Sequence, residues 1–112
     1  MTKKKINIVA FIPARANFKG IKNKNIINFL GLPLIAYSIK ISNTIKEINS
    51  VFISTDSKKI QKISKKYNAL SPFLRPAKIS GDKSSDLEAF KHFYNFYKKK
   101  YKKKIDLIIH LR

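Results

Sequence analysis

Residues 6–12 form a nearly continuous apolar run, and this run limits the possible folds more than any other feature of the chain. Its β-branched residues predict a strand. Because polar residues do not alternate with the apolar ones, both faces of this strand should be buried. Strands of this kind belong to parallel sheets that helices cover on both sides, so the run predicts an α/β protein.

Strand and helix patterns alternate along the rest of the chain. In order, the patterns predict a helix at 33–43, a strand at 50–54, a helix at 58–67, a short extended segment at 69–74, a helix at 86–101 and a strand at 105–111. This alternation predicts a mostly parallel sheet with helices on both faces. Ligands of such sheets bind at the carboxyl ends of the strands, where we expect residues 13–25, Thr55 with Asp56, and the chain after Arg112.

Local signals refine the three helices. Ser57 and Ser85 are expected N-caps, and Ser85 should form a capping box with Glu88. Asn68 can close the middle helix in a left-handed conformation. The first helix should bury a mostly apolar face that contains Leu34, Ile35, Ser38, Ile39 and Ile41. The last helix carries aromatic residues at helical spacing, which indicates core rather than a ligand site: Phe90, Phe93, Tyr94, Tyr97 and Tyr101.

The formal charge of the 112-residue chain is +19, which brings a nucleic-acid partner into consideration. Only Arg15, Arg75 and Arg112 are arginines among the 25 basic residues, although base and phosphate recognition favour arginine. Lysine, isoleucine and asparagine are all abundant and share A/T-rich codons, so codon bias also explains the lysines. A non-catalytic basic module that binds nucleic acid stays open as an alternative, supported by tyrosines interleaved with lysines at 94–101.

The chain contains no cysteine, which excludes disulfides and cysteine-ligated metals and fits a reducing compartment. Residues 1–16 imitate a secretory signal, but the apolar stretch is short, Asn7 interrupts it and lysines follow at once. No apolar run approaches the ~20 residues that span a bilayer. We therefore expect a cytoplasmic protein.

The loop at 13–25 is the most informative segment for function. It places Arg15, Lys19, Lys22 and Lys24 around Gly20, directly after the first strand. It lacks the Lys-Ser or Lys-Thr of a P-loop and the three glycines of a dinucleotide fingerprint. Glycine lets backbone N–H groups turn toward one anion, and basic side chains add charge-assisted bonds to phosphate. The pattern predicts an anion site, while a solvated basic loop remains the alternative.

Several ordered motifs carry a family resemblance. Residues 12–15 (Ile-Pro-Ala-Arg), 19–21 (Lys-Gly-Ile) and 24–25 (Lys-Asn) together resemble the nucleotide-binding signature of the acylneuraminate cytidylyltransferases. These enzymes activate sialic acids and related sugar acids with CTP. Segments 31–39, 51–56, 73–77 and 106–112 resemble later motifs of the same family, in the same order. The resemblance extends from about Asn7 to Arg112, which is nearly the whole chain.

The resemblance implies a Rossmann-like, three-layer nucleotidyltransferase fold and an enzyme that transfers CMP from CTP to a sugar acid of the sialic or legionaminic type, with release of pyrophosphate. It implies catalytic roles for Arg15, which faces the triphosphate, and Lys19, which neutralises the departing pyrophosphate. It places Asn25 and two serines near the base and ribose, and Arg75 at the cytosine. The other nucleotide-site residues that it implies are Pro13, Ala14, Gly20, Lys24, Ser84 and Ser85.

The resemblance also implies Mg²⁺, with ligands that we expect outside this chain, and a homodimer for full-length members. Residues 1–112 would then be the N-terminal nucleotide-binding part of an incomplete domain, inactive by itself. Phe18 stands where relatives often carry serine, which removes one possible hydroxyl contact. Three residues have local alternatives: Arg75 as a surface-loop residue, Asp56 as a cap for the following helix, which we favour, and His110 as a packed or sheet-face residue rather than a base.

Overall fold

A parallel sheet forms the centre of the computed structural model, which describes residues 5–18, 21–81 and 83–111. Its strand order is β6 (Ser50–Ser54), β1 (Ile8–Pro13) and β7 (Leu107–His110). β1 pairs with both neighbours in parallel. Beyond β6, Leu70 makes a single parallel bridge to Phe52, which is where the sequence predicts a short extended segment. The predicted parallel sheet is therefore confirmed.

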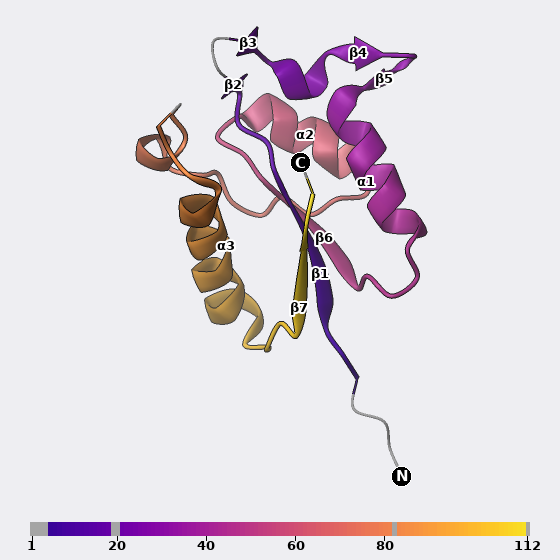
Figure 1. Cartoon of the computed structure of the whole chain (residues 1–112), viewed down its shortest axis with the longest axis vertical. Helices are drawn as coiled ribbons and strands as arrows, with labels where there is room; N and C mark the ends of the chain where they lie inside the picture. The colour runs from indigo at the N-terminus through magenta and orange to yellow at the C-terminus, as the bar shows by residue number, and fades with distance from the viewer. Residues whose placement is uncertain (1–4, 19–20, 82, 112) are drawn as a thin grey trace.

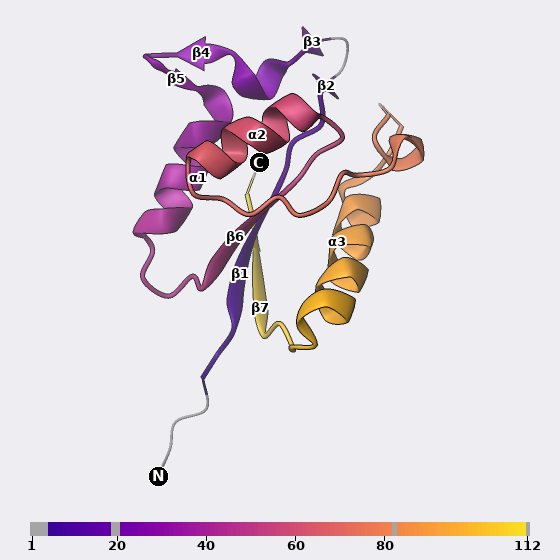
Figure 2. The same cartoon turned by 180° about the vertical axis from the view of Figure 1, so that it is seen from behind.

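Helices cover both faces of this sheet. α1 (Leu34–Thr44) and α2 (Lys58–Lys66) lie on one face, and α3 (Asp86–Tyr101) lies on the other (Figures 1 and 2). The side chains of β1 alternate between the two resulting cores. Ala10 and Ile12 pack with the α1 and α2 residues, whereas Val9 and Phe11 pack with those of α3. All four are at most 2% exposed, so the prediction of a strand buried on both faces is confirmed.

The core on the α3 side is largely aromatic. Phe93 is fully buried, with its ring centroid 5.0 Å from that of Phe11 and 5.1 Å from that of Phe52. Tyr97 is also buried and meets Phe52 edge to face. The predicted aromatic stripe is thus core at these two positions, while its other members, Phe90, Tyr94 and Tyr101, are half-buried at the margins.

The buried face of α1 differs from the predicted one. It consists of Ile35, Ala36, Ile39 and Ser42, while Leu34 and Ile41 are exposed. The pattern of apolar residues did not reveal this because α1 packs on the sheet along a narrow stripe, and the small residues at 36 and 42 permit the close approach. Ser42 satisfies its buried hydroxyl by donating to the carbonyl of Ser38.

The predicted helix ends are confirmed. The Ser57 hydroxyl accepts the Ile60 N–H at the start of α2, and Ser85 and Glu88 form the reciprocal capping box of α3. Asn68 has a φ of 71°, the left-handed conformation expected after the middle helix. These ends fix where the chain leaves and re-enters the sheet.

Small elements build up the region above the carboxyl end of β1 (Figure 1). The predicted loop at 13–25 contains one antiparallel pair, β2 (Asn17–Phe18) with β3 (Ile21–Lys22), and a second pair follows it, β4 (Asn28–Phe29) with β5 (Leu32–Pro33). The 3₁₀ helix η1 (Lys24–Ile26) lies between these pairs, and a second one, η2 (Ala77–Ile79), precedes α3. The segment after β1 therefore contains short regular elements, although many of its described residues are exposed.

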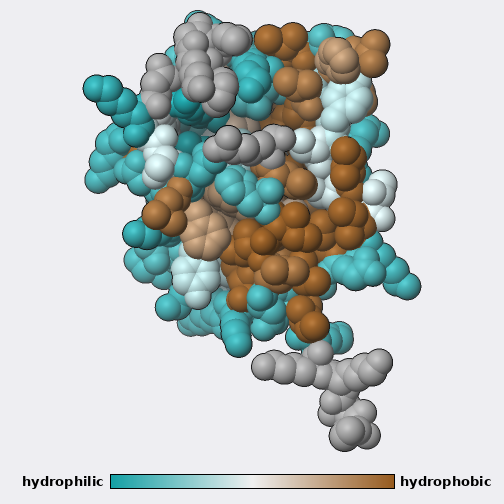
Figure 3. Space-filling view, viewed as in Figure 1, coloured by the Kyte–Doolittle hydropathy of each residue, from teal (hydrophilic) through white to brown (hydrophobic). Residues whose placement is uncertain are grey.

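One face of the molecule is notably apolar. In Figure 3, hydrophobic side chains gather over β7 and the adjoining part of the sheet, with Leu107 52% and Ile6 62% exposed. β7 is an edge strand among the described residues. Across that same part of the chain, no helix has the length and apolar character needed to span a membrane.

Candidate functional site

The topology singles out one place on the sheet edge. The connections that use α1 and α2 run on one face of the sheet, whereas the connection through α3 to β7 runs on the other (Figures 1 and 2). The strand order therefore reverses between β1 and β7. In open α/β sheets, ligands bind outside the carboxyl ends of the strands at such a switch point. The residues after β1, at the end of β6 and at the end of β7 are the candidates.

The backbone around Arg15 is held on three sides. The Ala14 N–H donates to the Ser54 carbonyl oxygen (2.8 Å), and the Ala16 N–H donates to Asp56 Oδ1 (2.8 Å). The Asn25 side chain donates from Nδ2 to the carbonyl oxygen of Arg15 (3.1 Å). These bonds join the loop to β6 and to η1. They fix the point from which the Arg15 side chain extends, and its Nη1 atom is buried.

Arg75 reaches the same region from the segment after α2. Its guanidinium donates from Nε to Ser54 Oγ (3.0 Å) and from Nη2 to the Ser54 carbonyl oxygen (2.8 Å). The Arg75 backbone N–H bonds the carbonyl of Thr55 (2.7 Å). Only 6% of Arg75 is exposed, so the alternative of a surface-loop arginine is wrong. Two hydrogen bonds therefore hold the buried Arg75 guanidinium at the carboxyl end of β6.

The charges of this region act on one another. Burial lowers the pKa of Arg75, and the nearby positive charge of Arg15 lowers it further, whereas Asp56 and Asp86 oppose the shift. Two arginines that lie 60 positions apart in the sequence thus share one electrostatic environment. Two carboxylates partly balance them. Such a cluster can attract and orient an anion that enters from solvent.

The prediction that Asp56 caps the helix after it is wrong. Asp56 does not cap α2, because Ser57 performs that role. Its carboxylate instead accepts the Ala16 N–H from the loop after β1. The reason is geometric: Ser57 has the extended conformation that an N-cap requires, and the side chain of Asp56, two residues after the end of β6, reaches the loop after β1 instead.

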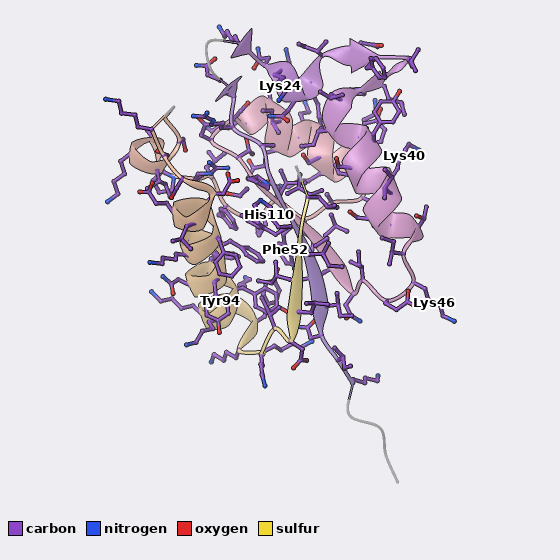
Figure 4. The ribbon with its side chains drawn as sticks, in the orientation of Figure 1. Lys24, Lys40, Lys46, Phe52, Tyr94 and His110 are labelled. Carbon is purple, nitrogen blue, oxygen red and sulfur yellow. The ribbon has the colours of Figure 1, made fainter. Side chains whose placement is uncertain are left out.

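The other residues implied by the resemblance lie around this cluster, with different local contacts. Pro13 ends β1, and Ala14 is buried against the α1 and α2 core. Lys24 lies in η1 above the carboxyl end of the sheet (Figure 4). Lys19 and Gly20 lie outside the described residues, so their predicted roles remain predictions.

The two serines before α3 already have partners in the fold. Ser84 Oγ accepts the Gly81 N–H (3.2 Å), and Ser85 is the N-cap of α3. Their predicted contacts with base and ribose would therefore use hydroxyl groups that also hold a turn and a helix end. A hydroxyl has one donor and two acceptor positions, so a second contact is chemically allowed.

His110 lies at the carboxyl end of β7, as its strand pattern predicts (Figure 4). Its ring packs 5.8 Å from the Phe11 ring, and its Nε2 is 3.8 Å from Asp86 Oδ2. The His110 side chain is 41% exposed, so His110 lies on the face of the sheet rather than in the core, and the expectation that it does not act as a base stays a prediction. The placement also brings the start of α3 next to the end of β7.

The sequence did not reveal the roles of Ser54 and His92. Ser54 is completely buried and receives both guanidinium bonds; its only signal is a polar residue directly at a strand's carboxyl end. His92 lies on α3 with its ring 4.9 Å from that of Phe73. Burial, and then the charge of Arg75, lowers the pKa of His92. Nothing in the helical pattern predicts this electrostatic interaction between Arg75 and His92.

The described residues do not offer a metal site. Within 5–18, 21–81 and 83–111, no three histidine, aspartate or glutamate side chains converge on one point. Mg²⁺ requires several oxygen ligands in near-octahedral array. The Asp56 carboxylate also already holds the Ala16 N–H. These residues do not fit the ion that the resemblance implies.

The aromatic platform required by the nucleic-acid alternative is not present on α3. Phe93 and Tyr97 face the core, and the Phe90 and Tyr94 rings stack on each other with centroids 6.1 Å apart. Base stacking needs exposed ring faces next to basic groups. The described structure therefore gives this alternative no support.

Comparisons with known proteins place the chain in a family and agree with its fold. A family profile described as cytidylyltransferase matches residues 9–106. The N-acylneuraminate cytidylyltransferase of Escherichia coli is 37% identical over 90 residues, which is 80% of this chain and 21% of that protein. The pseudaminic acid cytidylyltransferase of Campylobacter jejuni is 41% identical over 81 residues, which is 72% of this chain and 35% of that protein. The chain thus spans about a fifth to a third of the length of these relatives.

A solved structure supports the same fold. The structure of CMP:2-keto-3-deoxy-manno-octonic acid synthetase complexed with CTP superposes with a TM-score of 0.73 at 17% sequence identity. The match covers 94% of this chain and 39% of that one. At this identity the likeness concerns the fold alone, and it confirms the predicted Rossmann-like α/β architecture.

Proposed function

Because this chain belongs to the cytidylyltransferase family, we propose that it forms the CTP-binding part of an enzyme that transfers CMP to a sugar acid. In this reaction the anomeric hydroxyl oxygen of the sugar acid bonds to the α-phosphorus of CTP. The bond between that phosphorus and the pyrophosphate oxygen breaks, and pyrophosphate leaves. The relatives named for N-acylneuraminate and pseudaminic acid support this class of acceptor.

One observation supports the proposal most strongly: at the switch point of the sheet, the Ser54 carbonyl oxygen accepts both the Ala14 N–H beside Arg15 and Nη2 of Arg75. Phosphoryl transfer spreads negative charge over phosphoryl oxygens, so it requires cations that are already in position. Arg15 would contact the triphosphate from its tethered backbone. Lys19, outside the described residues, would neutralise the departing pyrophosphate.

Recognition of the cytosine base would use Arg75, and contacts with the rest of the nucleoside would use Asn25, Ser84 and Ser85. Two of the five guanidinium N–H groups of Arg75 bond Ser54, and other donors can meet the carbonyl oxygen of a cytosine. Asn25 would act on the nucleotide while its Nδ2 holds the Arg15 carbonyl, and Ser84 and Ser85 would approach the ribose from the start of α3. The family resemblance supplies these last roles. No step is assigned to Mg²⁺, since the described residues do not fit it.

We also propose a cytoplasmic location, a homodimer for the full-length protein, and no turnover by residues 1–112 alone. The first two properties rest on the family resemblance and the absence of cysteine. Sedimentation of the full-length protein tests the second proposal, and an assay of pyrophosphate release by the purified 112-residue chain tests the third. A stable full-length monomer would contradict the second, and measurable turnover by residues 1–112 would contradict the third.

Titration with CTP tests the proposed function directly. CTP should shift the backbone amide NMR signals of residues 13–25, and Arg15→Ala should weaken binding roughly ten- to hundredfold, since a charged hydrogen bond contributes about 1.5–3 kcal/mol. Lys46→Ala is the matched control because Lys46 is an exposed cation near the far end of α1 (Figure 4). Unshifted signals at 13–25, or equal losses in both variants, would refute the proposal.

A further inference from the structure

The link between β1 and β6 continues beyond the ends of the two strands. In the register of these strands, Pro13 pairs with Ser54, and the Ala14 N–H bonds the Ser54 carbonyl (2.8 Å). Hydrogen bonds in a parallel ladder are evenly spaced, so the next N–H that points toward β6 belongs to Ala16. Its regular partner would be the backbone carbonyl of residue 56.

The chain has already turned toward α2 at that position. The Ser57 N–H bonds Thr55 Oγ1 (3.1 Å), and α2 begins at Lys58. The Ala16 N–H instead bonds the side chain of Asp56, with Oδ1 at 2.8 Å. A carboxylate thus takes the place of a ladder carbonyl. We propose that Asp56 is the positioning residue of Arg15, holding the loop after β1 in register with β6 so that the guanidinium faces the bound triphosphate.

Three features support a positioning role over a purely local one. Arg15 lies between the two tethered N–H groups, and the second bond ties the backbone on its carboxyl side to the segment after β6. Without that bond, the carbonyl groups of Arg15 and Ala16 would keep only their bonds to Asn25 and Asn23, within the loop itself, among the described contacts. The bonded residues are 40 positions apart, so the contact links two separate segments of the chain. The Asp56 carboxylate also acts on Arg75, whose pKa it shifts, and this places the tether inside the charged cluster.

The inference rests on the proposed function, because it concerns the same anion site. It goes further in one respect: the site requires the acceptor oxygen of the side chain at position 56 and does not require the negative charge of the carboxylate. Asparagine keeps a carbonyl oxygen and loses the charge, whereas alanine loses both. The two substitutions therefore separate the hydrogen bond from the electrostatic effect.

A matched control exists at the opposite end of the sheet. Asp106 Oδ2 accepts the Asn7 N–H at 2.8 Å, directly before β1. Asp106→Ala removes the same kind of bond between a carboxylate and a backbone N–H, also adjoining β1, but away from the candidate site. It should lower Tm to a similar degree and leave anion binding unchanged.

The experiment measures binding of CTP and of tripolyphosphate to the 112-residue chain by calorimetry, and exchange of the Ala16 amide hydrogen by NMR. Asp56→Ala should weaken both ligands roughly three- to tenfold, the net effect of one hydrogen bond, and should accelerate Ala16 exchange. Asp56→Asn should keep Ala16 protected and bind both ligands at least as well as the parent chain, since a like charge near the phosphates is removed.

Each contrary result has a defined meaning. If the parent chain binds neither ligand, the proposed function fails, and this inference fails with it. If the parent binds but Asp56→Ala matches it, or Asp106→Ala loses as much binding, the positioning role alone is overturned. Asp56→Asn keeps the test decisive even where Asp56→Ala unfolds: a folded asparagine variant that has lost binding or Ala16 protection overturns the inference.

Discussion

Replacing Arg75 with methionine tests whether the buried guanidinium stabilises the fold at the carboxyl end of β6. The substitution removes the bonds from Nε to Ser54 Oγ (3.0 Å) and from Nη2 to the Ser54 carbonyl (2.8 Å). Hydrogen bonds to charged groups contribute about 1.5–3 kcal/mol each. Removing the buried charge offsets part of this loss, because burial disfavours the charged form of Arg75.

We therefore expect Arg75→Met to lower the free energy of unfolding by about 1–3 kcal/mol. At roughly 4 °C of Tm per kcal/mol for a domain of this size, the shift is about 4–12 °C. The Ser54 carbonyl keeps the Ala14 N–H as a partner, so no large additional penalty for an unpaired acceptor is expected. Urea denaturation followed by far-UV circular dichroism measures the difference.

A double-mutant cycle with Ser54→Ala isolates one bond. Ser54→Ala removes only the bond to Oγ, since Nη2 bonds the backbone. The coupling free energy between the two substitutions should be about 1.5–2 kcal/mol, the lower part of the range for a charged donor. Arg75→Lys should not restore stability, because lysine lacks the planar fork. If the effects of the two substitutions on the free energy of unfolding add within about 0.5 kcal/mol, the Arg75–Ser54 bond does not stabilise the fold. A loss of only about 0.5 kcal/mol for Arg75→Met, as at a surface position, would refute the stabilising role of the guanidinium.

Two further predictions concern α3. Phe93→Ala should lower the free energy of unfolding by about 3–5 kcal/mol, because the ring is fully buried between Phe11 and Phe52; Leu87→Ala, at a position 59% exposed on the same helix, should change it by less than about 0.5 kcal/mol in the same urea series. Burial and then Arg75 lower the pKa of His92 in the folded chain, so the unfolded chain binds the proton first and stability falls as pH drops below about 6.5. Tm measured from pH 7 to 5 should decline less steeply in His92→Gln, and equal slopes would contradict the coupling.

The candidate site was only partly accessible to sequence reasoning. Four basic residues around Gly20, directly after a buried strand, predicted an anion site at the carboxyl end of the sheet, with a solvated basic loop as the alternative; the anion site stays a prediction. The family resemblance pointed to Arg75 but not to its partners. The strand pattern placed Thr55 and Asp56 at the ligand-binding edge, but only the structure showed that Asp56 holds the Ala16 N–H and that Ser54 accepts the Arg75 guanidinium.

The sequence by itself determined the features whose physics is local. A continuous apolar run predicted that β1 is buried on both faces, and side chains within one helical turn predicted the caps at Ser57 and Ser85. Tertiary structure decided which stripe of α1 faces the sheet and which carboxylate holds the loop of Arg15. These outcomes depend on contacts between residues up to 40 positions apart, and such contacts follow from strand register and helix packing rather than from any short pattern.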